Sequence, residues 1–144
     1  MLLVDTGVNS SHLFWRFNLI DLKKIKRFAQ EIHDKNNDGH GFDHIERVVA
    51  LAQKILLTEP SANQELVLAT CYLHDTYDEK LTDDVPKQKA KVAQFLNELK
   101  IDKKLIDELF MIIDNMSFSS NLIERKTLSL NGQIVQDADR LDAM

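Results

Sequence analysis

The sequence of 144 residues has few of the residues that disulfide-stabilised and turn-rich proteins need. It holds only 4 glycines and 2 prolines, which favours helices over the many tight turns of a sheet protein. Its single cysteine, Cys71, excludes an intramolecular disulfide, so a reducing, cytoplasmic setting is the default expectation. The length is that of one ordinary domain with a substantial core.

Two more absences exclude broad classes of protein. The sequence has no run of about 18 apolar residues, so no membrane-spanning helix is expected, and its start lacks the basic and then apolar order of a signal peptide. Acidic residues outnumber basic ones, with 23 Asp and Glu against 18 Lys and Arg and a net charge of −5. A chain with this balance lacks the basic footprint of a nucleic-acid-binding protein.

The strongest positive signal is helical periodicity, which begins at about residue 21. Apolar residues recur three and four positions apart over 22–32 and again over 45–56, which predicts two amphipathic helices. Pro60 ends the second of these, and Ser61 with Gln64 forms a capping box for a third helix. That third helix is apolar on nearly all sides, so it should lie in the centre of the fold.

Three more helices complete the pattern. One is expected over about 86–99, with Ala90, Ala93, Leu96 and Leu99 on one stripe and Val92 and Phe95 beside it. Another starts at Asp102 as its N-cap. Residues 117–131 are expected to form a loop, and a last helix is marked by Ile134, Val135, Ala138 and Leu141. No two-residue period is present, so the fold class is all-α: a single-domain helical bundle over 21–144, preceded by an arm or short helix over 1–20.

Polar side chains interrupt this apolar pattern in three places. In CYLHDTYDEK, His74 and Asp75 follow directly on the most apolar helix of the chain. A buried charge needs a partner or a metal, because leaving it unpaired costs about 3–5 kcal/mol. GHGFDHIERVV places His44 at the start of the second helix, and the last helix carries three carboxylates, Asp137, Asp139 and Asp142.

Three helices therefore bring metal-ligand side chains toward a common point. Two imidazoles and two carboxylates suit a six-coordinate transition metal with open positions, so Mn²⁺ or Fe²⁺ fits better than the closed tetrahedral site of structural zinc. The spacing alone leaves an alternative open, in which His44, His74 and Asp75 are buried side chains that only hydrogen-bond to one another.

These motifs resemble those of the HD superfamily of metal-dependent phosphohydrolases, in particular its small stand-alone bacterial members. The resemblance rests on GHGFDHIERV, LHDTYDEK and IVQDADRLDAM in that order, with IIDNMSFS as a weaker segment, and it covers about residues 20–144. It implies an HD-type helical bundle whose metal ligands are His44, His74, Asp75 and one aspartate of the last motif. Asp139 is preferred to Asp137, because the Asp-Arg pair of ADR matches the ligand position in more distant HD proteins.

The resemblance also implies a chemistry. A divalent metal, with Mn²⁺ as first choice and Mg²⁺, Fe²⁺ or Co²⁺ as alternatives, would lower the pKa of a bound water and polarise a phosphoryl oxygen. Asp78 would act with His74 and Asp75 in catalysis, by accepting a proton or orienting the attacking water. Cations near the metal would hold the substrate phosphate, and the candidates are Arg47, Lys80 and Lys87.

The function implied is hydrolysis of a phosphate ester or anhydride, with a nucleotide as the expected small-molecule partner. Three alternatives stay open: a phosphodiesterase acting on a cyclic or linear dinucleotide, a non-catalytic nucleotide- or metal-binding module, and an inactive fragment. Relatives continue for several helices beyond the position of Met144, so we expect the C-terminal helices of the domain to be missing here. A homodimer is left open as well.

Overall fold

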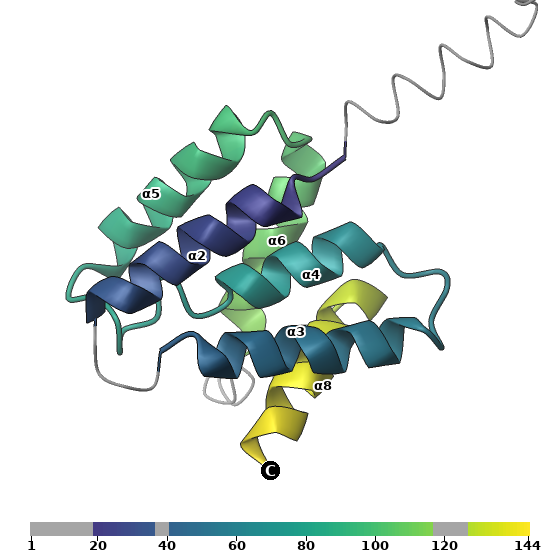
Figure 1. Ribbon diagram of the computed structural model, residues 1–144. Helices are drawn as coiled ribbons and strands as arrows, with labels where there is room; N and C mark the ends of the chain where they lie inside the picture. The colour runs from purple at the N-terminus through teal and green to yellow at the C-terminus, as the bar shows by residue number, and fades with distance from the viewer. Residues whose placement is uncertain (1–18, 37–40, 117–126) are drawn as a thin grey trace, which may run out of the picture.

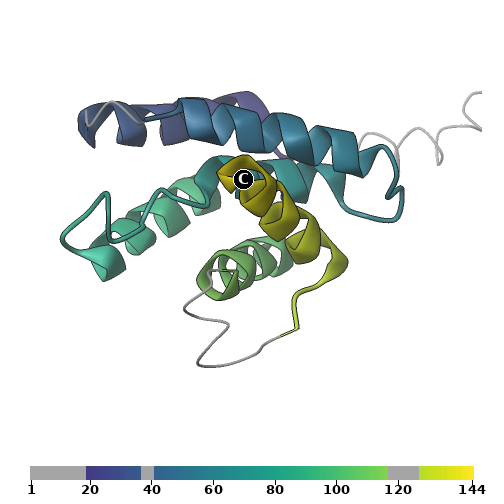
Figure 2. The same ribbon diagram turned by 90° about the horizontal axis from the view of Figure 1, so that it is seen from below.

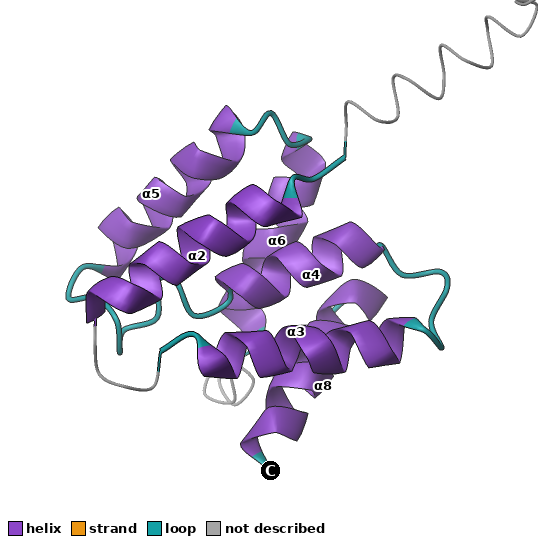
Figure 3. Ribbon diagram, viewed as in Figure 1, coloured by secondary structure: helices purple, strands orange, loops and turns teal. Residues whose placement is uncertain are grey.

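Helices make up all the regular secondary structure of the described part of the chain. The computed structural model describes residues 19–36, 41–116 and 127–144, and these contain no strand (Figure 3). This confirms the all-α prediction. Most of the predicted arm over 1–20 and most of the predicted loop over 117–131 lie outside the described residues. None of the described helices is both long and apolar enough to cross a bilayer. The helices are α2 (Leu22–Asn36), α3 (Asp43–Leu56), α4 (Gln64–Leu73), α5 (Val85–Glu98), α6 (Lys103–Asn115) and α8 (Leu130–Ala143).

The apolar helix α4 lies at the centre of the fold, as its sequence predicts. It contacts α2, α3, α6 and α8, and Figure 1 shows it between α2 and α3 with α6 behind it. Leu66 and Leu73 are almost completely buried, at 1% and 0% exposure. Burying a leucine side chain of this kind contributes about 1.5–3 kcal/mol. The packing around α4 therefore fixes where its C-terminal end, which carries His74, must lie.

The start of α4 differs from the capping box that the sequence predicts. The N-cap is Asn63, whose side chain accepts a hydrogen bond from the Leu66 N–H at 3.1 Å. Ser61 is still part of the turn that ends α3, where the Ala62 N–H donates to the Glu59 carbonyl at 3.1 Å. The Asn63 N–H in turn donates to Asn131 Oδ1 on α8 at 2.7 Å. The prediction of a Ser61–Gln64 box is wrong because Asn63, two residues later and itself a preferred N-cap residue, caps the helix instead.

Helix α8 crosses α3 and α4 and carries the last group of aspartates. It begins at Leu130, inside the predicted loop, because Ser129 caps it by accepting from the Gly132 N–H at 3.2 Å. Gly132 allows a close approach to α6, since a Cβ there would lie 3.0 Å from Ile112 Cγ1. The predicted apolar stripe is buried as far as Ala138, but Leu141 is 48% exposed. Figures 1 and 2 show the reason: the last turn of α8 projects past α3.

Helix α5 packs on its neighbours through much of the expected apolar surface, except at Ala90. Val92 and Leu96 are fully buried, while Ala90 is exposed, and Phe95 stacks on Phe28 of α2 with ring centroids 4.0 Å apart. The large aromatic and branched side chains give more apolar area than the alanines. This packing fixes the position of α5, and the segment that connects α4 to α5 contains much of the candidate site.

Candidate metal centre

His74 is the C-cap residue of α4 and points into the protein. Its side chain is only 3% exposed, and its Nδ1 lies 2.7 Å from the Cys71 carbonyl oxygen. A carbonyl can only accept, so Nδ1 must carry the proton and donate it. When the ring is neutral, the lone pair therefore lies on the other nitrogen, Nε2. A polar side chain can therefore be buried at the end of so apolar a helix, because the Cys71 carbonyl accepts its Nδ1 proton and holds the ring in one orientation.

His44 lies in the first turn of α3 and presents the same nitrogen to the same place. Its Nδ1 donates to Asp142 Oδ2 at 2.6 Å, and its Nε2 lies 3.1 Å from Asp139 Oδ1. Its ring centroid is 5.5 Å from that of His74, with the planes inclined by 65°. Two helices that are separate in sequence therefore aim their Nε2 atoms at one region.

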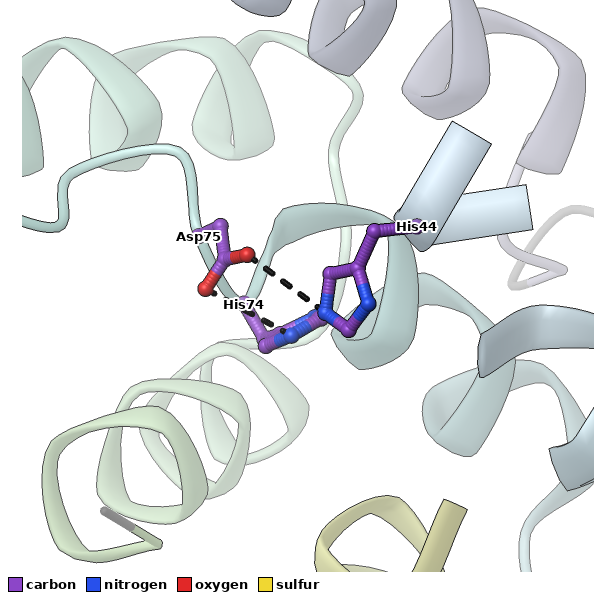
Figure 4. Close-up of side chains that lie close together, drawn as sticks. All are labelled: His44, His74 and Asp75. Atoms are coloured by element: carbon purple, nitrogen blue, oxygen red, sulfur yellow. Dashed lines mark ion pairs between the residues drawn. The ribbon is translucent and has the colours of Figure 1, made fainter. Parts of the chain in front are cut away.

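Two carboxylates complete the group. The Asp75 oxygens lie 3.5 Å from His74 Nε2 and 3.7 Å from His44 Nε2, and Figure 4 shows the three side chains turned toward one another. One ligand atom from each of these three residues falls within 4.8 Å of the others. From α8, Asp139 Oδ1 lies 3.1 Å and 3.2 Å from the two Nε2 atoms. Asp137, the alternative aspartate, is exposed.

This donor set fits a divalent metal ion. Both Nδ1 atoms already donate to fixed acceptors, which is the arrangement that orients metal-bound histidines and leaves Nε2 for the ion. Imidazole nitrogens combined with carboxylate oxygens suit Mn²⁺, Fe²⁺ and Co²⁺, and no thiolate is among them to favour a structural zinc site. The residues that would hold the ion are His44, His74, Asp75 and Asp139.

The electrostatics of the group are those of a cation site. Burial opposes a charge on His74, but Asp75 and Asp139 outweigh it and raise the pKa of His74 to about 9. The hydrogen bond to Asp139 likewise raises the pKa of His44, against its burial. Burial also opposes ionisation of Asp139, yet the hydrogen bonds from the two imidazoles lower its pKa. Without a metal ion, protons on the two imidazoles supply the positive charge that faces the carboxylates.

Metal binding should therefore become stronger as the pH rises. The pKa of His74 is raised from 6.5 to about 9, so near neutral pH a metal ion must displace its proton. The apparent affinity for Mn²⁺ should increase roughly tenfold per pH unit for each proton displaced, and level off above about pH 9. Calorimetric titrations with Mn²⁺ at several pH values between about 6.5 and 9 would measure this change in affinity. An affinity independent of pH would exclude His74 as a ligand.

Asp142, the third aspartate of the last helix, has a place in the site that the sequence did not predict. Its side chain is only 10% exposed, and it accepts hydrogen bonds from His44 and from Arg47, whose Nε lies 2.8 Å from Oδ1 and whose Nη2 lies 3.3 Å from Oδ2. Arg47 and then His44 lower the pKa of Asp142. The signal that could have found it is spacing, because residues three apart on a helix share a face and Asp142 follows Asp139 by three.

Two hollows open beside the metal centre. The smaller, of about 210 Å³, is lined by His33, Gly41, His44, Asp75, Asp78, Lys80 and Leu81. The larger, of about 520 Å³, is lined by His44, His74, Asp75, Tyr77, Asp78, Glu79, Lys80, Val85, Ile113, Asp114, Met116 and Asp139. The predicted catalytic residue Asp78 and the predicted phosphate-binding residue Lys80 line both hollows. Arg47 lines neither of these two hollows. Lys87 lines a third hollow, together with Thr82 and Gln88.

Comparison with known proteins identifies one family and similar proteins from two bacteria. Residues 41–144 match the family described as "HD domain". The chain is 34% identical over 123 residues to "Uncharacterized protein YpgQ" of Bacillus subtilis (strain 168), covering 85% of this chain and 60% of that protein. A crystal structure of a Lactobacillus plantarum protein is similar with 38% identity and a TM-score of 0.77, over 85% of this chain and 56% of that one. The crystal structure of YpgQ in complex with ADP has 34% identity and a TM-score of 0.67, over 85% and 57%. The chain thus spans less than two thirds of the length of each of these relatives.

Proposed function

We propose that this chain, which belongs to the HD-domain family, is a metal-dependent phosphohydrolase acting on a phosphate ester or anhydride of a nucleotide. The observation that carries the proposal is the convergence of two imidazole Nε2 atoms and two carboxylates at the wall of a hollow that also contains Lys80. This combination provides ligands for a divalent cation beside an ammonium group that can meet a phosphate. A purely structural cluster has no need of the hollow.

The metal ligands proposed are His44, His74, Asp75 and Asp139. A divalent ion held there, Mn²⁺ in the first instance, would lower the pKa of a coordinated water and polarise a phosphoryl oxygen. The chain fixes the ligands in advance: the Cys71 carbonyl and the Asp142 carboxylate each hold one imidazole through Nδ1. Such preorganisation keeps the Nε2 atoms in place while the reaction proceeds.

Asp78 and Lys80 supply the remaining groups in this proposal. Asp78 is half-buried and lines both hollows with the ligand Asp75, so it is placed to accept a proton from the attacking water or to orient it. Asp78 Oδ1 accepts from the Lys80 backbone N–H at 2.9 Å, which fixes the turn that carries both residues. The Lys80 ammonium can then neutralise phosphate charge next to the metal centre.

The substrate class rests on two observations. The relative YpgQ has been crystallised in complex with ADP, and the larger hollow, at about 520 Å³, is within the size of small-molecule sites. The decisive experiment incubates the purified chain and Mn²⁺ with a panel of nucleoside mono-, di- and triphosphates, and assays phosphate and pyrophosphate separately. Release of either product above that of an Asp75→Ala control supports the proposal, and release of neither contradicts it.

Lys80 and Arg47 should behave differently when each is replaced by alanine. Lys80→Ala should lower kcat/KM by roughly 10–100-fold, the loss typical of one hydrogen bond to a charged group, while the stabilisation by Mn²⁺ stays unchanged. Arg47→Ala should weaken Mn²⁺ binding itself, because it releases Asp142 and through it His44. Kinetics combined with melting curves in the presence of Mn²⁺ separate the two effects. A loss of activity in Arg47→Ala with full Mn²⁺ affinity would instead assign Arg47 to the substrate phosphate.

A further inference from the structure

The larger hollow has a second polar cluster, which the proposed chemistry does not use. Among the residues that line it are Tyr77, from the segment after α4, and Asp114, near the end of α6. The metal ligands come from α3, from the end of α4 and from α8, so the cluster reaches the hollow from a different helix. Its carboxylate therefore needs a separate explanation.

The Asp114 carboxylate is held in place from both of its oxygens. The Tyr77 hydroxyl donates to Oδ1 at 2.7 Å, and the Lys89 ammonium donates to Oδ2 at 2.6 Å. Lys89 also lies over the rings of Tyr77 and Phe110, with its Nζ 5.8 Å and 5.3 Å from their centroids. Cation–π contacts of this kind help to hold the ammonium group. Asp114 thus has a fixed orientation without belonging to the metal centre.

Asp114 nevertheless retains capacity to accept further hydrogen bonds. A carboxylate has about four lone-pair positions, and the two donors occupy only part of them. The side chain is 37% exposed and lines the hollow. A ligand group that meets it must be a donor, such as a hydroxyl or an amino group, because a phosphate would be repelled by the negative charge.

We propose that Asp114 is a specificity-determining residue, which accepts a hydrogen bond from a hydroxyl or amino group on the organic part of a phosphorylated substrate. The inference rests on the proposed function, because it assumes that the phosphate lies at the metal centre beside Lys80. With a cationic end and a carboxylate in the same hollow, a nucleotide has one favourable orientation. Val85, Ile113 and Met116 line the same hollow and offer apolar contact area to a base or sugar ring.

The test compares ligands with and without an organic part. Calorimetry in the presence of Mn²⁺ would measure the affinities of four nucleoside diphosphates (adenosine, guanosine, cytidine and uridine) and of inorganic pyrophosphate. Asp114→Asn should weaken binding of at least one nucleotide by about 10–100-fold and leave pyrophosphate binding and the Mn²⁺-induced rise in melting temperature unchanged. The asparagine oxygen can still accept from Tyr77, and the Lys89 ammonium, which loses its acceptor, is exposed enough to be solvated, so the variant should fold. Asp107→Asn is the matched control, since Asp107 lies on the same helix in an exposed ion pair with Lys103.

Each outcome has a distinct meaning. Equal losses for nucleotides and pyrophosphate, or no loss for any nucleotide, would overturn the role of Asp114 and leave the proposed function standing. If the parent chain binds none of these compounds with Mn²⁺, this inference fails, and the proposed function fails with it when the nucleotide panel also yields neither phosphate nor pyrophosphate. The 2′-deoxy and 3′-deoxy forms of the affected nucleotide then identify the donor. If a sugar hydroxyl is responsible, the parent protein should bind one of these forms as weakly as Asp114→Asn binds the unmodified nucleotide. Unchanged binding of both forms by the parent protein points to an amino group of the base.

Discussion

Replacing Asp75 with alanine should abolish both the stabilisation of this protein by Mn²⁺ and its metal-dependent hydrolysis. Asp75 lies within reach of both imidazole Nε2 atoms, 3.5 Å from His74 and 3.7 Å from His44, so its loss removes a ligand from the centre of the group. An ion that binds only the native state stabilises it by about 2.7 kcal/mol at a hundredfold excess over its dissociation constant. For a chain of this size that corresponds to a rise in melting temperature of about 10 °C.

Melting curves with and without Mn²⁺ measure the first effect, and product assays measure the second. The parent should show the full rise and Asp75→Ala none, while hydrolysis should fall by about a thousandfold or more, to the background rate. Asp83→Ala is the matched control, because it removes an exposed aspartate of the same segment that lines neither hollow. Equal rises for parent and Asp75→Ala would show that the ion binds elsewhere on this acidic protein.

The same substitution has a smaller effect on the metal-free protein, and the structure gives its sign. Burial opposes a charge on His74, but Asp75, together with Asp139, raises its pKa from 6.5 to about 9. A raised pKa contributes stability that is complete below the unfolded value and is lost as the pH rises through the folded one. Asp75→Ala should therefore destabilise the metal-free protein most below about pH 6.5, and the difference should fade toward pH 9.

Local patterns explain what the sequence could predict. The helices follow from the spacing of apolar residues, and His74 with Asp75 stands out because two polar side chains follow an almost wholly apolar helix. The resemblance to the HD family, which is confirmed by the match over residues 41–144, adds His44 and Asp139. The structure brings these residues together, with Asp139 Oδ1 3.1 Å from His44 Nε2.

Long-range contacts explain what the sequence could not predict. The Asn63 N–H at the start of α4 donates to Asn131, which is 68 residues away, and no local pattern contains that partner. Arg47 follows His44 by one helical turn, which predicts a contact with phosphate, but no local pattern indicates that its guanidinium also meets Asp142, 95 residues away. The crossing of α3 and α8 decides both what Arg47 contacts and how His44 is held.

The role of Asp142 leads to the second large expected effect. Asp142→Ala removes the acceptor of the His44 Nδ1 proton, which lies 2.6 Å away, and leaves the imidazole free to rotate or to change tautomer. Loss of such an outer hydrogen bond typically lowers metal affinity or activity by about 10–100-fold. We therefore expect Asp142→Ala to weaken Mn²⁺ binding by that factor, and Asp142→Asn to weaken it less, since the amide oxygen can still accept.

Asp137→Ala provides the comparison, because Asp137 lies on the same helix but is exposed. It removes the same charge from α8, so any general electrostatic attraction of the ion should fall equally in both variants. Direct titration with Mn²⁺ should show near-parent affinity for Asp137→Ala and the large loss only for Asp142→Ala. Equal losses would reduce the effect of Asp142 to net charge. A loss confined to Asp137→Ala would move the aspartate ligand from Asp139 to Asp137 and would require α8 to turn on its axis relative to α3.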